Sequence, residues 1–230
     1  MTMQLNLPDY WMPRPKINLD EDTRAAFDQL LESVKAAGQN SLIEYNLPAP
    51  KWQFLCHLAD QHGIALHGTG DPGIRVFEPR QAMDLNDFGN QAAVYAAGDG
   101  IWAMFFAIVD RERYAMSVSN ACIRLADETG YVTEALYVFS IGQAALSQRP
   151  WRTGVVYLLP PDTFVQQPPE SFGPYKVHIP QLASQVAVTP IAQLEVAPED
   201  FPFLGNIRGH DDARLEELAH AMRTGAPWPH

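Results

Sequence analysis

The segment that decides the fold reads ALHGTGDPGIR at residues 65–75 and, after a short interval, DFGNQAAVYAA at residues 87–97. A short apolar run ends at His67 and is followed at once by Gly68, and glycine allows the close backbone approach that small ligands need. A second apolar run carries Tyr95 and ends at Gly-Asp-Gly, residues 98–100. These two patterns predict neighbouring strands whose side chains His67 and Tyr95 face one cleft.

The rest of the chain predicts helices on both sides of a group of short strands. Helical spacing of apolar residues and capping signals predict helices over residues 20–38, 51–61, 101–109 and 211–222. Runs of β-branched and aromatic residues predict strands over residues 116–125, 132–141, 154–159, 176–179 and 185–196, the first two as an antiparallel pair. The proline-rich stretch 166–174 predicts a loop. Because strands do not alternate regularly with helices, the pattern indicates an α+β fold.

Length and composition favour one compact domain. The chain has 230 residues, 47% of them hydrophobic, which is enough to build a sizeable core. Residues 1–19 contain three prolines with aromatic residues between them, so we expect an extended arm that packs on a single domain formed by residues 20–230. No internal repeat interrupts this organisation.

Charge and cysteine content limit the classes of function. The net charge of −11 argues against a protein whose main role is to hold a nucleic-acid backbone. Cys56 and Cys122 have no metal-site spacing, so we expect buried thiols and no metal site. The absence of a long apolar run or a basic-then-apolar leader predicts a cytoplasmic protein with no membrane partner.

Four short motifs occur in a fixed order within the deciding segment. They are His67-Gly68-Thr69, Gly73-Ile74-Arg75 with Pro79, Phe88-Gly89 and Val94-Tyr95-Ala96-Ala97. This series resembles the ADP-ribosyltransferase domain, in its poly(ADP-ribose) polymerase-like branch. The resemblance implies split antiparallel β-sheets flanked by helices, and NAD as the substrate from which ADP-ribose is transferred. It leaves the acceptor open among proteins, nucleic acids and small molecules.

The resemblance also assigns roles at the nicotinamide end of NAD. His67 would hydrogen-bond a ribose hydroxyl, a role that an imidazole nitrogen suits. The backbone of Gly68, in the turn that Thr69 completes, would hold the carboxamide. Tyr95 would stack on the nicotinamide ring, because a flat aromatic face provides contact area and orientation.

Further positions complete the implied NAD site. Phe105 or Phe106 would form the opposite wall. Arg75 would meet the phosphates or the adenosine end with its guanidinium group. The helix serine that the family places beside the carboxamide is replaced here by Trp102 or Ala103.

One departure from the family concerns its third conserved residue, a glutamate that opens a late strand. The best match begins at Gln185, and a rival placement on residues 153–157 also lacks a carboxylate. A neutral amide can bind a ribose hydroxyl but is no base at neutral pH. The resemblance therefore favours single transfer or weak NAD hydrolysis over chain elongation.

Each of these residues also has an ordinary structural interpretation. A histidine at a strand end often serves the fold alone, Tyr95 and the two phenylalanines can be core residues, and Arg75 can be a solvated surface charge. At the level of function, the alternatives are an inactive module that binds NAD or ADP-ribose, and an RNA 2'-phosphotransferase-like enzyme. The second requires basic residues that capture a phosphate.

Overall fold

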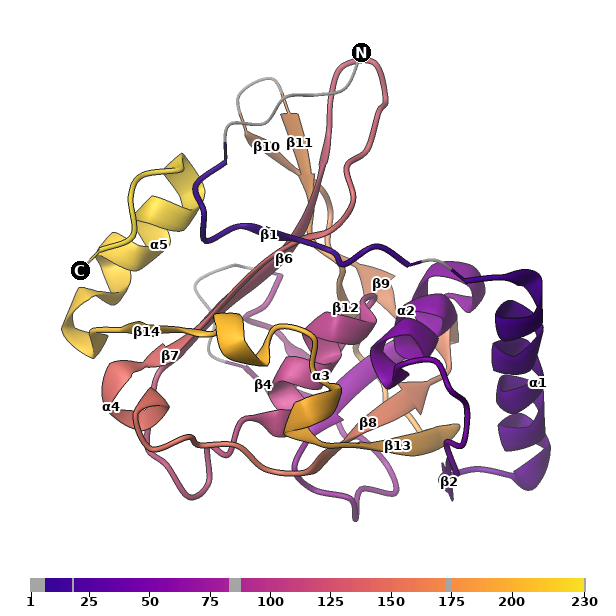
Figure 1. The fold of residues 1–230 in the computed structure, drawn as a ribbon. Helices are drawn as coiled ribbons and strands as arrows, with labels where there is room; N and C mark the ends of the chain where they lie inside the picture. Colours follow the sequence, from indigo (N-terminus) through magenta and orange to yellow (C-terminus); the bar gives the residue numbers. More distant parts are fainter. Residues whose placement is uncertain (1–6, 18, 83–87, 173–174, 230) are drawn as a thin grey trace.

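The computed structural model describes residues 7–17, 19–82, 88–172 and 175–229, and these form two β-sheets with helices between and around them (Figure 1). Residues 1–6 and 18 of the expected arm, and Asp87 of the deciding segment, lie outside the described residues. The α-helices are α1 Glu21–Ala37, α2 Lys51–His62, α3 Gly100–Ile108, α4 Gln143–Leu146 and α5 Leu215–Thr224.

The first sheet has the strand order β1-β7-β6-β11-β10, with β14 also paired to β7. Its strands are β1 Met12–Pro13, β6 Val118–Ala126, β7 Leu136–Gly142, β10 Glu170–Phe172, β11 Tyr175–His178 and β14 Arg208–His210. The long strands β6 and β7 pair antiparallel as the sequence predicted, whereas β14 runs parallel to β7.

The second sheet carries the deciding segment and has the order β2-β13-β8-β3-β5-β12-β9, with β4 also paired to β5. Its strands are β2 Ser41–Leu42, β3 Ala65–Thr69, β4 Arg80–Gln81, β5 Ala92–Ala97, β8 Gly154–Leu159, β9 Val165–Gln166, β12 Gln181–Ser184 and β13 Ala192–Val196. Only β2 and β13 are parallel among the pairs described in this sheet, so the α+β class expected from the sequence is confirmed.

Local signals explain where the helices begin and end. The side chain of Asp20 accepts a hydrogen bond from the Thr23 amide at the start of α1, and Gly63 ends α2 in the left-handed conformation. The last predicted helix begins later than expected, because a three-residue 3-10 turn, Asp212–Arg214, precedes α5. Asp211 caps that turn by accepting a hydrogen bond from the Ala213 amide.

Two expectations for the later strands are wrong. The stretch 166–174 is not a simple loop, because it contains part of β9 and all of β10. Both are short edge strands, where proline costs little since one side of the strand needs no partner. The strand expected over residues 185–196 is shorter, because β12 Gln181–Ser184 ends before Gln185 and only Ala192–Val196 of the expected range forms a strand, β13.

The core lies around α3, which packs between the two sheets (Figure 1). Phe105 of α3 contacts Phe139 of β7, with ring centroids 4.7 Å apart, while the opposite side of the helix lies on β3 and β8. Both cysteines are buried free thiols in this core, as expected, and burial raises the pKa of Cys56 to about 12. No helix in the described ranges is long and apolar enough to cross a bilayer.

The described part of the N-terminal arm packs on the domain. Strand β1 pairs with β7, and the Arg14 guanidinium lies 2.5 Å from the carboxylate of Asp99. The same carboxylate accepts a hydrogen bond from the Tyr137 hydroxyl and caps α3 by accepting from the Trp102 amide. One buried carboxylate therefore joins the arm, the first turn of α3 and the first sheet.

Candidate functional site

A cavity of about 770 Å³ opens beside α3, where β3 and β5 separate. This volume lies within the range of small-molecule and cofactor sites. The residues that line it come from β3, β5, α3, β12, the loop after α3 and the segment before β8: Leu66, His67, Gly68, Thr69, Tyr95, Ala96, Ala97, Trp102, Ala103, Phe106, Arg111, Glu112, Ala115, Met116, Arg152 and Gln181.

The cavity exists because the ladder between β3 and β5 stops early. Leu66 and Ala97 form the one described pair between these strands, although β3 continues to pair with β8 as far as Thr69. Beyond that pair, the His67 side chain takes the place of a ladder contact, because its Nδ1 lies 2.7 Å from the backbone oxygen of Tyr95. The imidazole therefore holds together the two strands at the point where they diverge.

The proton on His67 can be assigned from its partner. A carbonyl oxygen only accepts, so Nδ1 carries the hydrogen and donates it to Tyr95. Burial lowers the pKa of His67, since desolvation disfavours the imidazolium, and the hydrogen bond to Tyr95 opposes this shift only in part. Nε2 is then an acceptor, for which the described residues provide no hydrogen-bond partner. This tautomer leaves Nε2 with a lone pair that can accept from a hydroxyl or amide donor.

Tyr95 contributes its ring to the cavity, while its hydroxyl serves the fold. The register places Tyr95 opposite Ala183 of β12 and, by strand alternation, on the same sheet face as Gly68. The same alternation places the His67 side chain on the other face, where it packs on Phe77 with ring centroids 4.7 Å apart, although both residues line the cavity. Its hydroxyl donates to the Phe88 carbonyl at 3.0 Å and accepts from the Gln91 amide at 3.0 Å. The hydroxyl therefore fixes the turn that leads into β5.

The aromatic wall of the cavity consists of Trp102 and Phe106. These residues are four apart on α3, so they lie one above the other on the helix side that faces the cavity. Phe105 lies about 100° around the helix axis from Phe106, because an α-helix turns by about 100° per residue. Its side chain is therefore directed away from the cavity and is fully buried against β7. Of the two phenylalanines predicted for the site, only Phe106 lines the cavity.

Gly68 and Thr69 form the floor beneath this wall. A Cβ atom at Gly68 would lie 1.8 Å from the backbone oxygen of Ala103, so only glycine lets α3 come this close to β3. The Thr69 hydroxyl accepts a hydrogen bond from the Asp71 amide at 3.2 Å and stabilises the following turn. Because β5 diverges from β3 here, the backbone N–H and C=O groups next to His67 lie outside the ladder between these two strands.

Two predicted site residues lie away from the cavity. Arg75 is exposed on the loop after β3 and is not among the described residues that line it. Gln185 is also exposed, beyond the end of β12, and its amide donates to the Gln91 side chain at 3.1 Å. The first residue of β12 is Gln181, which pairs with Ala97 and lines the cavity. The glutamine at this site is therefore Gln181.

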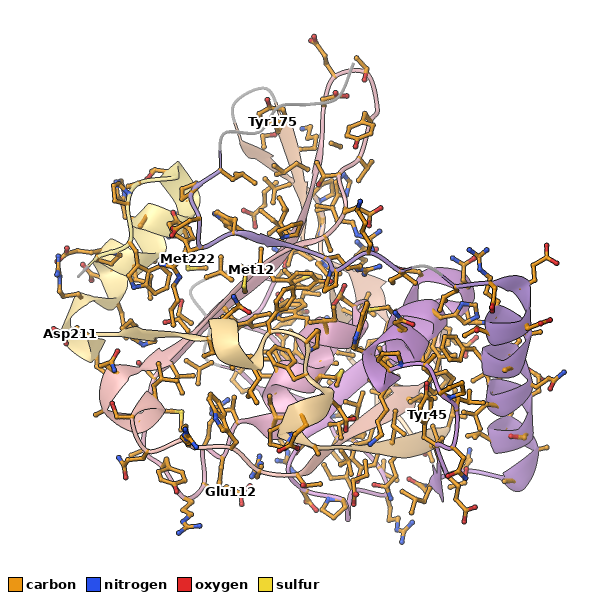
Figure 2. All side chains as sticks on the ribbon, in the orientation of Figure 1. Met12, Tyr45, Glu112, Tyr175, Asp211 and Met222 are labelled. Carbon is orange, nitrogen blue, oxygen red and sulfur yellow. The ribbon has the colours of Figure 1, made fainter. Side chains whose placement is uncertain are left out.

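Three charged residues of the cavity rim were missed by the sequence motifs. Arg152 packs against Gly70 and lies 3.2 Å from Glu112 and 3.8 Å from Asp110. Glu112 is 79% exposed and lies at the outer edge of the molecule in Figure 2. Arg111 is exposed and has no ion pair within the described part of the chain. Arg111 and Glu112 follow α3 whereas Arg152 lies far along the chain, before β8, so only the fold brings these groups to one cavity.

The chain matches no protein-family model, and comparisons with curated proteins and with solved structures give no match.

Proposed function

We propose that the cavity binds NAD and that the protein transfers ADP-ribose slowly to an acceptor, or to water, as an ADP-ribosyltransferase-like enzyme. The observation that carries the proposal is the fixed state of His67, a residue of the cavity lining whose Nδ1 donates to the backbone of Tyr95, which leaves Nε2 as an acceptor. A ribose hydroxyl can donate to that nitrogen, and no reorganisation of the ring is then needed.

The surroundings of His67 suit the two ends of the ligand. Trp102, Phe106 and the Tyr95 ring provide flat apolar surface for a nicotinamide ring. Backbone groups beside Gly68 lie outside the β3–β5 ladder and can pair with a carboxamide. At the rim, the guanidinium of Arg111, which has no ion-pair partner among the described residues, can meet a phosphate.

We expect slow turnover from the polar groups that line the cavity. Departure of nicotinamide develops positive charge on the ribose, and a nearby carboxylate would stabilise it. Gln181 supplies an amide dipole in its place, and the cavity carboxylate Glu112 already pairs with Arg152. A neutral amide also cannot take a proton from an acceptor at neutral pH.

The experiment measures NAD binding first and chemistry second. Calorimetry with NAD and with ADP-ribose gives the affinity, and chromatography measures nicotinamide released over hours. His67→Ala should weaken NAD binding by at least about tenfold through loss of the acceptor and of the strand bridge, whereas His220→Ala, exposed on α5, should leave it unchanged. Unchanged affinity in a folded His67→Ala variant would refute the assignment.

A second candidate is a binding module for NAD or ADP-ribose without catalysis. The ion pair between Glu112 and Arg152 favours it, because the one carboxylate among the described lining residues is engaged. Tight NAD binding with no nicotinamide release above the uncatalysed rate would select this candidate over the enzyme.

A further inference from the structure

A cluster of two histidines and one aspartate joins α1 to α2, remote from the cavity described above. His57 Nε2 lies 2.7 Å and His62 Nε2 lies 2.8 Å from the same oxygen, Oδ1 of Asp28. The two imidazole rings meet edge to face, with centroids 5.4 Å apart. Three potential ligand atoms, all within 4.8 Å of one another, thus converge on one point.

The donor set has the composition of a transition-metal site. Two imidazole nitrogens and one carboxylate oxygen suit Zn²⁺ and similar divalent ions, which commonly take three protein ligands and one water. Tetrahedral bonds of about 2.0–2.1 Å place ligand atoms roughly 3.3 Å apart. The distances from Asp28 Oδ1 to the two histidine Nε2 atoms, 2.7 and 2.8 Å, therefore need to lengthen by only about half an ångström. Because the side chains of Asp28 and His62 are 49% and 31% exposed, they have room for that movement.

Burial differs among the three ligands in a way that fits an open site. His57 is buried and packs against Phe27, with ring centroids 5.4 Å apart, so its position is fixed by the core. Asp28 and His62 close the cluster from the solvent side, where a water can complete the coordination. The carboxylate also supplies negative charge, and hydrogen bonds from both histidines lower the pKa of Asp28.

We propose that Asp28, His57 and His62 bind one Zn²⁺ ion, or a similar divalent transition metal, and that the ion cross-links α1 to α2. Each neutral imidazole then carries its hydrogen on Nδ1, so that Nε2 donates its lone pair to the metal. The ion replaces two hydrogen bonds to one oxygen with three metal–ligand bonds, and α1 becomes fastened to the body of the domain at its middle. The sequence gives little sign of this site, because Asp28 and His57 are far apart along the chain.

The test uses untagged, chelator-treated full-length protein and Zn²⁺ alone. Calorimetry should show one ion per chain with a Kd in the micromolar range or tighter, and Co²⁺ should give the absorption bands of a four-coordinate site. At a hundredfold excess over Kd, Zn²⁺ should raise the Tm by about 5–10 °C.

Variants distinguish this site from unspecific binding to surface histidines. His62→Gln and Asp28→Asn should each weaken Zn²⁺ binding at least about tenfold, and both change exposed side chains, so that the fold is retained. The matched control is His220→Gln on α5, which lies on the opposite side of the molecule from α1 (Figure 1) and should bind Zn²⁺ as the wild type does. Wild-type affinity in His62→Gln, or the absence of saturable one-to-one binding in the wild type, would overturn the proposal.

Discussion

Replacing Gly68 by alanine tests whether the close packing of α3 on β3 is needed for the cavity and the fold. The new Cβ would lie 1.8 Å from the backbone oxygen of Ala103, 2.9 Å from its carbonyl carbon and 3.0 Å from the backbone nitrogen of Ala107. All three atoms belong to the helix backbone, so no side chain can rotate away. The helix and the strand must move apart instead, or the backbones of both must be strained.

The size of the effect follows from this geometry. Overpacking in a well-packed core costs about 1–3 kcal/mol and occasionally more, and a backbone contact this short belongs at the upper end. The gain from restricting the unfolded chain, about 0.4–1 kcal/mol, offsets part of it. We therefore expect Gly68→Ala to lower the free energy of unfolding by at least about 2 kcal/mol.

Urea denaturation followed by tryptophan fluorescence measures this difference. Gly205→Ala is the matched control, because no atom lies within 4 Å of the added Cβ and the backbone there needs no left-handed conformation. The control should unfold at the wild-type midpoint or slightly above it. If the two variants unfolded at the same urea concentration, the close packing of α3 on β3 would be refuted.

Three further perturbations test the buried charge, the histidine and the glutamine. Arg14→Met leaves the Asp99 carboxylate, 1% exposed, without its cation, so unfolding in urea should show a loss of about 3–5 kcal/mol; a loss under about 1 kcal/mol would contradict this. Because the pKa of His67 is lowered in the fold, the unfolded chain takes up the proton first. The contribution of His67 to stability should thus be constant above about pH 6.5 and fall below it by at most about 1.4 kcal/mol per pH unit, so His67→Gln should show a shallower fall than the wild type. If the proposed function holds, Gln181→Glu should speed nicotinamide release at least about tenfold and Gln185→Glu should not; equal rates in both would place the reaction elsewhere.

The sequence by itself determined the elements whose signals are local. Asp20 and Gly63 mark helix ends, and the spacing of Trp102 and Phe106 reveals one side of a helix, because capping and helical periodicity involve residues only a few positions apart. The α+β class and the strands that carry His67 and Tyr95 were predictable for the same reason.

Only the tertiary structure decided which of these side chains meet. The register of β12 against β5 determines that Gln181 reaches the cavity while Gln185 lies outside it. Residue propensities alone cannot predict this register to within a few residues. Arg152 reaches the same cavity from the segment before β8, and Asp28 meets two histidines across a helix pair. Such contacts depend on how distant segments pack, and packing is a property of the whole core.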